Sequence, residues 1–157
     1  MTAVLVVTLA GCGQPVPGAA PAGPEWRTDL RYGVGAATGA EPADLAGVGV
    51  EQHSGFDRIV LHFSGGLPGY RVAYRPAGNA GAPALGIRLE HIRGGAERHL
   101  RPGLPAVREL RAAPAAAGTA RLTVTLPAGT DRLPFRVGLA ADAFYVDVVH
   151  PDGEHST

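Results

Sequence analysis

The stretch from His53 to Arg75 constrains the fold of this chain more than any other part of the sequence. It contains two runs in which apolar and polar residues alternate, the period of a β-strand with one face in a core. The apolar positions are Ile59, Leu61 and Phe63 in the first run and Tyr70, Val72 and Tyr74 in the second. The segment between them, 64–69, is rich in glycine and proline, which favour chain reversal. The stretch therefore predicts two strands joined by a turn, as in a β-hairpin.

The same alternation recurs along the chain, with turn residues between the runs. It predicts further strands around residues 48–52, 85–89, 122–126, 135–137 and 144–148. Residues 107–117 fit either a short helix that Pro114 would end or another strand. Short strands separated by turn signals predict an all-β fold, and we expect a small antiparallel β-sandwich.

The alternation of inward and outward positions in the last two predicted strands places two opposite charges on the same face. Arg136 and Asp147 are the polar positions among inward-facing apolar neighbours, so both side chains should point outward. If the two strands pair, Val137 faces either Val146 or Phe144. The first register sets Arg136 directly opposite Asp147, and the second makes them diagonal neighbours. We expect a partly exposed ion pair that contributes at most ~1 kcal/mol.

Composition limits the classes of function. The 157 residues include 14 acidic and 14 basic side chains, so net charge gives no reason to expect a nucleic-acid partner. One cysteine excludes an internal disulfide and a cysteine-based metal site. The six histidines are scattered without the spacing of metal ligands. We therefore expect one small domain, monomeric, with no metal and no cofactor.

The N-terminal residues resemble a bacterial lipoprotein signal. An apolar run is followed at once by Leu9, Ala10, Gly11 and Cys12, and small residues before a cysteine suit cleavage and lipidation there. The alternative is an ordinary cysteine at the end of an apolar run. We expect residues 1–12 to be a signal segment and Cys12 to be a lipid anchor on the outer face of the cell membrane.

A segment without sustained periodicity follows the cysteine. Residues 13–45 are rich in proline, glycine and alanine, which predicts a disordered linker in front of a folded domain at 46–152 and a short disordered tail at 153–157. Trp26 is the exception within the linker. It either docks on the domain or a ligand, or remains an exposed ring.

Several short motifs, in order and at compatible spacing, resemble one protein family. They are the Gly55–Arg58 turn, Pro68-Gly69-Tyr70, Pro134–Val137 and the closing Val146–His150 segment. Over residues 46–152 the chain resembles the AMIN-like domain lipoproteins of high-GC Gram-positive bacteria. The resemblance implies a small β-sandwich related to the AMIN module, an envelope-targeting domain whose proposed ligand is peptidoglycan. It implies no catalytic residue.

Arginines and tyrosines near the first two strands are the candidate ligand contacts. Arg58 suits a carboxylate ligand, or it belongs to an exposed ion pair next to a turn-stabilising Asp57. Arginines beside aromatic rings suit sugars and the carboxylates of peptide stems, although a solvated strand face fits the same pattern. The candidates are Arg58, Tyr70, Arg71, Tyr74, Arg75 and Arg136.

No arrangement of residues predicts an enzyme. His53, Ser54 and Asp57 lie on one turn, where a triad seldom converges, and no nucleophile-elbow motif occurs. We expect a non-catalytic, membrane-anchored envelope lipoprotein that binds peptidoglycan or another wall polymer. The alternative is a lipoprotein that recruits an envelope enzyme or transporter through protein contacts, for example at a sheet edge.

Overall fold

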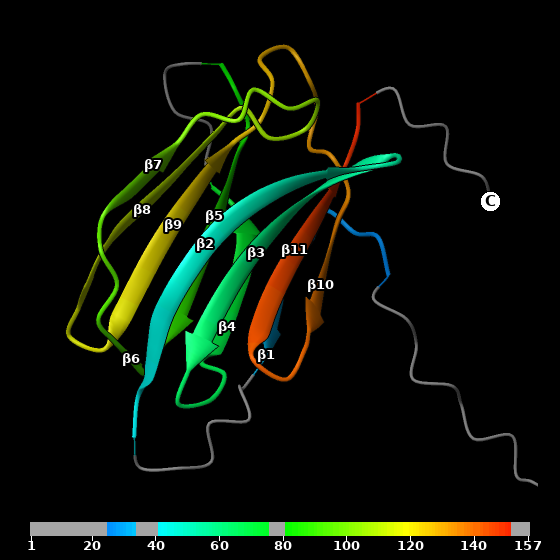
Figure 1. Cartoon of the computed structure of the whole chain (residues 1–157). Coiled ribbons are helices and arrows are strands. Elements are labelled where there is room, and N and C mark those ends of the chain that lie inside the picture. Colours follow the sequence, from blue (N-terminus) through cyan, green and yellow to red (C-terminus); the bar gives the residue numbers. More distant parts are fainter. Residues whose placement is uncertain (1–24, 34–40, 76–80, 152–157) are drawn as a thin grey trace, which may run out of the picture.

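A computed structural model describes residues 25–33, 41–75 and 81–151, which form an all-β fold of two sheets (Figure 1). One sheet has six strands in the order β1-β4-β5-β9-β8-β7, and the other has five in the order β10-β11-β3-β2-β6. The strands are β1 (Arg31–Gly33), β2 (Ala43–His53), β3 (Phe56–Ser64), β4 (Gly69–Tyr74), β5 (Ala84–Glu90), β6 (Ile92–Arg93), β7 (Arg98–Leu100), β8 (Glu109–Ala116), β9 (Thr119–Thr125), β10 (Phe135–Leu139) and β11 (Ala143–Val149). Neighbouring strands pair antiparallel, except for the short parallel contact between β2 and β6. The predicted all-β sandwich is confirmed.

The core lies between the inner faces of the two sheets. Its members are the apolar positions of the alternating runs, because every second side chain of a strand points to the same face. The inner faces meet where Tyr70 of β4 packs on Phe144 of β11 and Tyr74 of β4 packs on Phe135 of β10. The largest fully buried side chains are Phe135, Phe144, Ile59, Leu61, Leu85, Ile87, Leu89, Leu110, Leu122 and Leu126. The predicted inward faces are therefore correct.

The predicted hairpin between the runs at 59–63 and 70–75 is wrong, although both strands exist. β3 pairs with β2 and β11, whereas β4 pairs with β1 and β5 in the other sheet. The segment between them crosses from one sheet to the other, and Leu67 and Pro68 are buried in that crossing. Because the two apolar faces meet across the core, both strands bury their alternating residues without pairing. The hairpin in this region is instead β2–β3, closed by Ser54 and Gly55.

Irregularities in β2 and β8 explain two places where the sequence pattern was weak. In β2 the pairing with β3 shifts between Leu45 and Gly47, where β2 has one extra residue. Odd-numbered positions face the core before this bulge, and even-numbered positions such as Val48 and Val50 face it afterwards. Residues 107–117 resolve as a strand, β8, whose pairing with β9 shifts around Pro114. β7 pairs with β8 only at residues 110–112, so the proline lies where the strand has no outer neighbour among the described residues.

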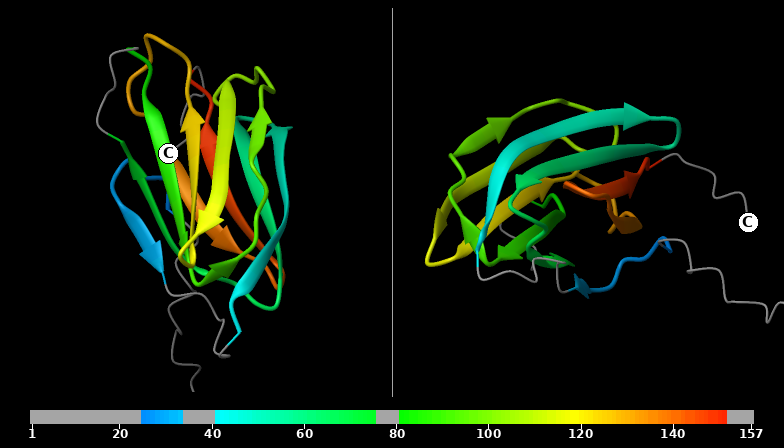
Figure 2. Two further views of the ribbon diagram at one scale, coloured as in Figure 1. Left: turned by 90° about the vertical axis from the view of Figure 1, so that its left-hand side faces the viewer. Right: turned by 60° about the horizontal axis from the view of Figure 1, so that its bottom comes forward.

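The N-terminal segment contributes to the fold, which corrects the predicted linker at 13–45. Arg27 and Phe135 exchange two backbone hydrogen bonds of 2.9 and 2.7 Å at the edge of β10. Four residues later β1 pairs with β4, at the edge of the other sheet (Figure 2). Residues 25–33, called the strap below, therefore connect the edges of the two sheets. Ala43, also within the predicted linker, is fully buried.

Several sequence predictions fall on residues outside the described ranges. Cys12 and the signal segment 1–12 are among them, as are residues 13–24, 34–40 and the tail 153–157. Within the described residues, no helix is long and apolar enough to span a membrane.

The strap should stabilise the sandwich mainly through Trp26, whose ring covers the Arg136 guanidinium 4.4 Å away. Replacing Trp26 by Ala removes this contact, and we expect a loss of about 1 kcal/mol, or a drop of about 4 °C in melting temperature. Tyr32→Ala is the matched control, because Tyr32 on the same strap is 77% exposed. Equal melting temperatures for Trp26→Ala and the unmodified chain would contradict a stabilising strap.

Candidate functional site

The six candidate residues separate into three groups in the structure. Arg58 and Arg136 lie on the outer face of the five-stranded sheet, Arg71 and Arg75 lie on the outer face of the six-stranded sheet, and Tyr70 and Tyr74 face the core. The sandwich thus holds the two arginine groups on opposite outer surfaces, and no single site includes all six.

A row of alternating charge crosses the five-stranded sheet. Arg136, Asp147, Arg58 and Glu51 lie directly opposite one another on β10, β11, β3 and β2. Arg58 makes a bidentate interaction with Asp147, in which Nε donates to Oδ1 at 2.6 Å and Nη2 donates to Oδ2 at 2.8 Å. Arg136 Nε donates to Asp147 Oδ2 at 2.8 Å. Each positive charge in this row has a negative neighbour, an arrangement that stabilises a sheet.

The predicted pairing of Arg136 with Asp147 is confirmed, in the register that sets Val137 opposite Val146. The pair is partly exposed, as predicted, only on its Arg136 side, because the Asp147 side chain is 0% exposed. Two arginines and an aromatic cover surround it, so its charge is compensated where water is excluded. The hydrogen bonds to Asp147 raise the pKa of the Arg58 guanidinium above its usual value.

Aromatic rings cover both arginines. The Cζ of Arg58 lies 4.3 Å from the Tyr145 ring centroid, and that of Arg136 lies 4.4 Å from Trp26 and 5.0 Å from Phe56. Tyr145 reaches this position because its partner on β10 is Gly138, where a Cβ would come within 1.9 Å of the ring. Stacking of this kind fixes guanidinium groups. Arg58 and Arg136 are therefore held by the fold and are poor candidates for ligand contact.

Asp57 is fully buried, which corrects the expectation of an exposed or turn-stabilising residue. Its Oδ2 accepts hydrogen bonds from the backbone N–H groups of Ala106 and Val107 at 2.7 and 3.0 Å. Its Oδ1 lies 2.8 Å from His150 Nε2. Asp57 thus ties the loop before β8 to the end of β11, and Arg58 pairs with Asp147 instead.

Both candidate tyrosines have structural partners. Tyr70 packs against Phe144 with ring centroids 4.8 Å apart, and Tyr74 packs against Phe135 at 6.0 Å. The Tyr74 hydroxyl donates to the Leu133 carbonyl oxygen at 2.6 Å. Burial raises the pKa of Tyr74 to about 12, so its hydroxyl stays protonated at neutral pH. These rings anchor β4 to the core.

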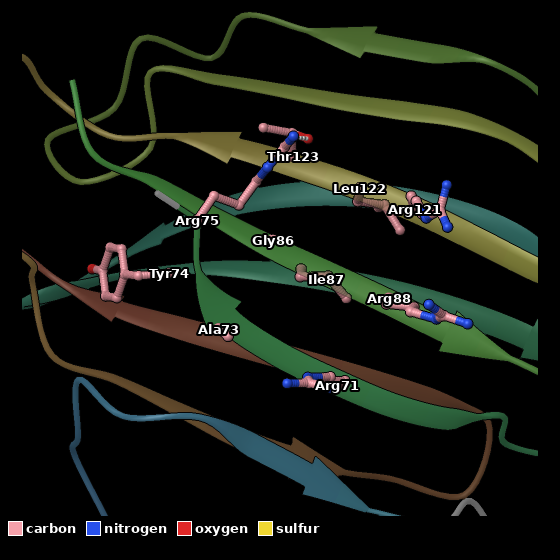
Figure 3. Close-up of a pocket in the computed structure, with 10 residues that line it drawn as sticks. All are labelled: Arg71, Ala73, Tyr74, Arg75, Gly86, Ile87, Arg88, Arg121, Leu122 and Thr123. Carbon is pink, nitrogen blue, oxygen red and sulfur yellow. Dashed lines mark hydrogen bonds between the residues drawn. The ribbon is translucent and has the colours of Figure 1, made fainter. Parts of the chain in front are cut away.

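The outer face of the six-stranded sheet carries a second charged row of a different kind. Arg71, Arg88 and Arg121 lie directly opposite one another on β4, β5 and β9. In the adjacent row, Ala73 and Gly86 are small and leave a shallow groove of about 400 Å³. Figure 3 shows the three arginines on neighbouring strands along this groove. We call Arg71, Arg88 and Arg121 the arginine row.

Arg75 borders the same groove. Its side chain crosses Gly86, where an added Cβ would come within 3.1 Å of Arg75 Cγ, and its Nη1 donates to Thr123 Oγ1 at 2.8 Å. Gly86 therefore allows Arg75 to reach from β4 across β5 to β9. In Figure 3 the Arg75 side chain extends to Thr123, whereas the Tyr74 ring points away from the arginines.

The charges of the arginine row are not balanced as those of the opposite sheet are. Like charges directly opposite one another on neighbouring strands are destabilising. Arg88 forms an exposed ion pair with Glu90, Nε to Oε1 at 3.2 Å. Among the described residues, Arg71 and Arg121 form no ion pair. A bound anion would offset this repulsion, so the arginine row is the candidate functional site.

Sequence reasoning found Arg71 and Arg75 but missed Arg88 and Arg121. Both are outward positions of predicted strands, so their alternation was visible. Their alignment with Arg71 depends on the registers of β4 with β5 and of β5 with β9, which join segments far apart in the sequence. Alternation reveals which face a residue occupies, but it carries no information about the residue opposite.

The guanidinium groups of the site are hydrogen-bond donors of the kind that suit anions, and its lining offers few other reactive groups. The described residues that line it include no carboxylate, thiol or imidazole. Nowhere in the described ranges do three or more His, Cys, Asp or Glu side chains group as metal ligands would. Family models, curated proteins and solved structures were compared with the chain, and none matches. The site is therefore assigned from its geometry alone.

The two charged rows predict opposite effects of neutralising an arginine. Arg121→Gln removes repulsion from Arg88, so we expect unchanged stability or a gain of up to about 1 kcal/mol. Arg58→Gln removes two hydrogen bonds to a buried carboxylate, so we expect a loss of about 2 kcal/mol. Urea unfolding at low ionic strength measures both. A clear loss of stability in Arg121→Gln would show that the arginine row is a structural element like its counterpart.

Proposed function

We propose that this chain is a non-catalytic cell-envelope lipoprotein that binds an anionic wall polymer, peptidoglycan or another, on the outer face of its six-stranded sheet. The observation that carries the proposal is the arginine row, in which three guanidinium groups face one another across neighbouring strands. On the five-stranded sheet, the corresponding row alternates positive and negative side chains. The row on the six-stranded sheet contains three positive side chains in succession.

The shape of the row suits an extended ligand. Neighbouring strands lie ~4.8 Å apart, so Arg71, Arg88 and Arg121 span about 10 Å along a line across the strands. The groove beside them is open to solvent, as a polymer ligand would require. Guanidinium groups bind carboxylates and phosphates through paired N–H donors. Peptide-stem carboxylates and wall phosphates both offer such acceptors.

The anchor is part of the same proposal. The Leu9–Cys12 sequence suits lipidation of Cys12, and the Pro/Gly-rich composition that follows suits a spacer between membrane and domain. A domain attached in this way would lie on the outer face of the cell membrane, where its six-stranded sheet could contact the wall. The resemblance to AMIN-like lipoproteins supports this location and the ligand class.

A sedimentation assay with purified cell walls tests the proposal. The full chain with Cys12→Ala, which we expect in the soluble fraction, is mixed with the walls and centrifuged. We expect it to pellet, to be released by muramidase digestion of the walls, and to be released by added salt, because screening weakens exposed ionic contacts.

Arg121→Gln should reduce pelleting several-fold, since it removes one of the three cationic contacts. Arg98→Gln is the matched control, an exposed arginine of β7 outside the groove lining. Absence of pelleting, together with a specific envelope protein recovered by crosslinking, would favour the alternative of a protein-interaction lipoprotein. If the Arg121→Gln variant pelleted as well as the chain with an unmodified arginine row, the proposed site would be wrong.

A further inference from the structure

One aromatic side chain continues the arginine row at its β1 end. Tyr32 lies directly opposite Arg71, so the cross-strand order is Tyr32, Arg71, Arg88 and Arg121. Four neighbouring strands at ~4.8 Å spacing give this line a length of about 14 Å. A second hollow of about 400 Å³ is lined by Tyr32, Arg71 and Glu90 among others, and it shares Arg71 with the arginine groove. The two hollows therefore adjoin.

The exposure of Tyr32 differs from that of the other aromatic residues around it. Tyr32 is 77% exposed, whereas Trp26 on the same strap covers Arg136 and Tyr70 packs on Phe144. Single exposed rings are common and need no explanation by themselves. The position of Tyr32 does, because it lies in line with three arginines, of which Arg71 and Arg121 have no ion-pair partner among the described residues.

We infer that the ligand of this row is an acidic saccharide, with a sugar ring stacked on Tyr32 and its carboxylates bound by the arginines. This inference rests on the proposed function, whose site it shares. An aromatic face offers apolar area to the C–H face of a sugar at a small cost in conformational entropy, and the tyrosine hydroxyl reaches water or ligand oxygens. A polyanion without rings would use the arginines and gain nothing from Tyr32.

Glu90 limits where the acidic groups can lie. It is the acidic residue lining the Tyr32 hollow, and it pairs with Arg88 at 3.2 Å. A carboxylate beside Glu90 would be repelled, whereas the groove on the other side of the row is lined by Arg71 and Arg121, which form no ion pair among the described residues, and by Arg88. The geometry thus assigns the neutral face of the ligand to the hollow beside Tyr32 and its charge to the arginine groove, whose lining has no carboxylate.

Isothermal titration calorimetry of the full chain with Cys12→Ala tests the inference. The probes are oligogalacturonate, in which every sugar carries a carboxylate, and inorganic polyphosphate of similar charge, which has no ring. We expect Tyr32→Ala to weaken oligogalacturonate binding about fivefold or more and to change polyphosphate binding less than about twofold. Tyr32→Phe should keep the stacking and bind like the unmodified chain. Arg121→Gln should weaken both probes.

Equal effects of Tyr32→Ala on the two probes would overturn the inference, as would the absence of oligogalacturonate binding by the unmodified chain. The proposed function can fail separately. If oligogalacturonate binding depends on Tyr32 while the chain does not pellet with cell walls, the saccharide site stands and its assignment to the wall falls. If Arg121→Gln abolishes wall binding while Tyr32→Ala changes neither binding assay, the wall function stands and Tyr32 has no part in it.

Discussion

The hydrogen bonds of the buried Asp147 carboxylate with Arg58 and Arg136 determine how charge is distributed on the outer face of the five-stranded sheet. The carboxylate holds Arg58 and Arg136 in place with three hydrogen bonds, and the rings of Tyr145, Phe56 and Trp26 close over them. The charged groups on this face thereby satisfy one another. The six-stranded sheet has the same geometry, a charged row across adjacent strands, but three of its members have the same sign. The arginine row therefore lacks the charge balance that the same molecule achieves on its other face.

The strap links the two faces. Its first part places Trp26 over Arg136 on the five-stranded sheet, and its last part, β1, places Tyr32 beside Arg71 on the six-stranded sheet. Between these contacts lies the backbone pairing of Arg27 with Phe135. A segment of nine described residues therefore contributes both to the stability of one surface and to the proposed ligand site of the other. Loss of the Trp26 contact should loosen β1 and with it the position of Tyr32.

Alternation in the sequence predicted which side chains face the core, and this was sufficient to anticipate the sandwich and the pairing of Arg136 with Asp147. That success depended on proximity, because β10 and β11 are joined by a short turn that limits the possible registers. Partners separated by long stretches of chain could not be predicted in this way. The β3 and β4 runs were assigned to one hairpin although they belong to opposite sheets, and Arg88 and Arg121 were not recognised as neighbours of Arg71. The strap was missed because a three-residue strand has no period, and its structure comes from pairing with β4.

The central claim is that anions bind the arginine row and not the arginines around Asp147. NMR of the Nε–H groups of 15N-labelled arginine measures this directly, since each guanidinium gives its own signal during a titration with oligogalacturonate. We expect the signals of Arg71, Arg88 and Arg121 to shift together with one affinity, while those of Arg58 and Arg136 stay in place because Asp147 already occupies their donors. Shifts confined to Arg58 and Arg136, or small shifts spread evenly over all arginines, would contradict the claim.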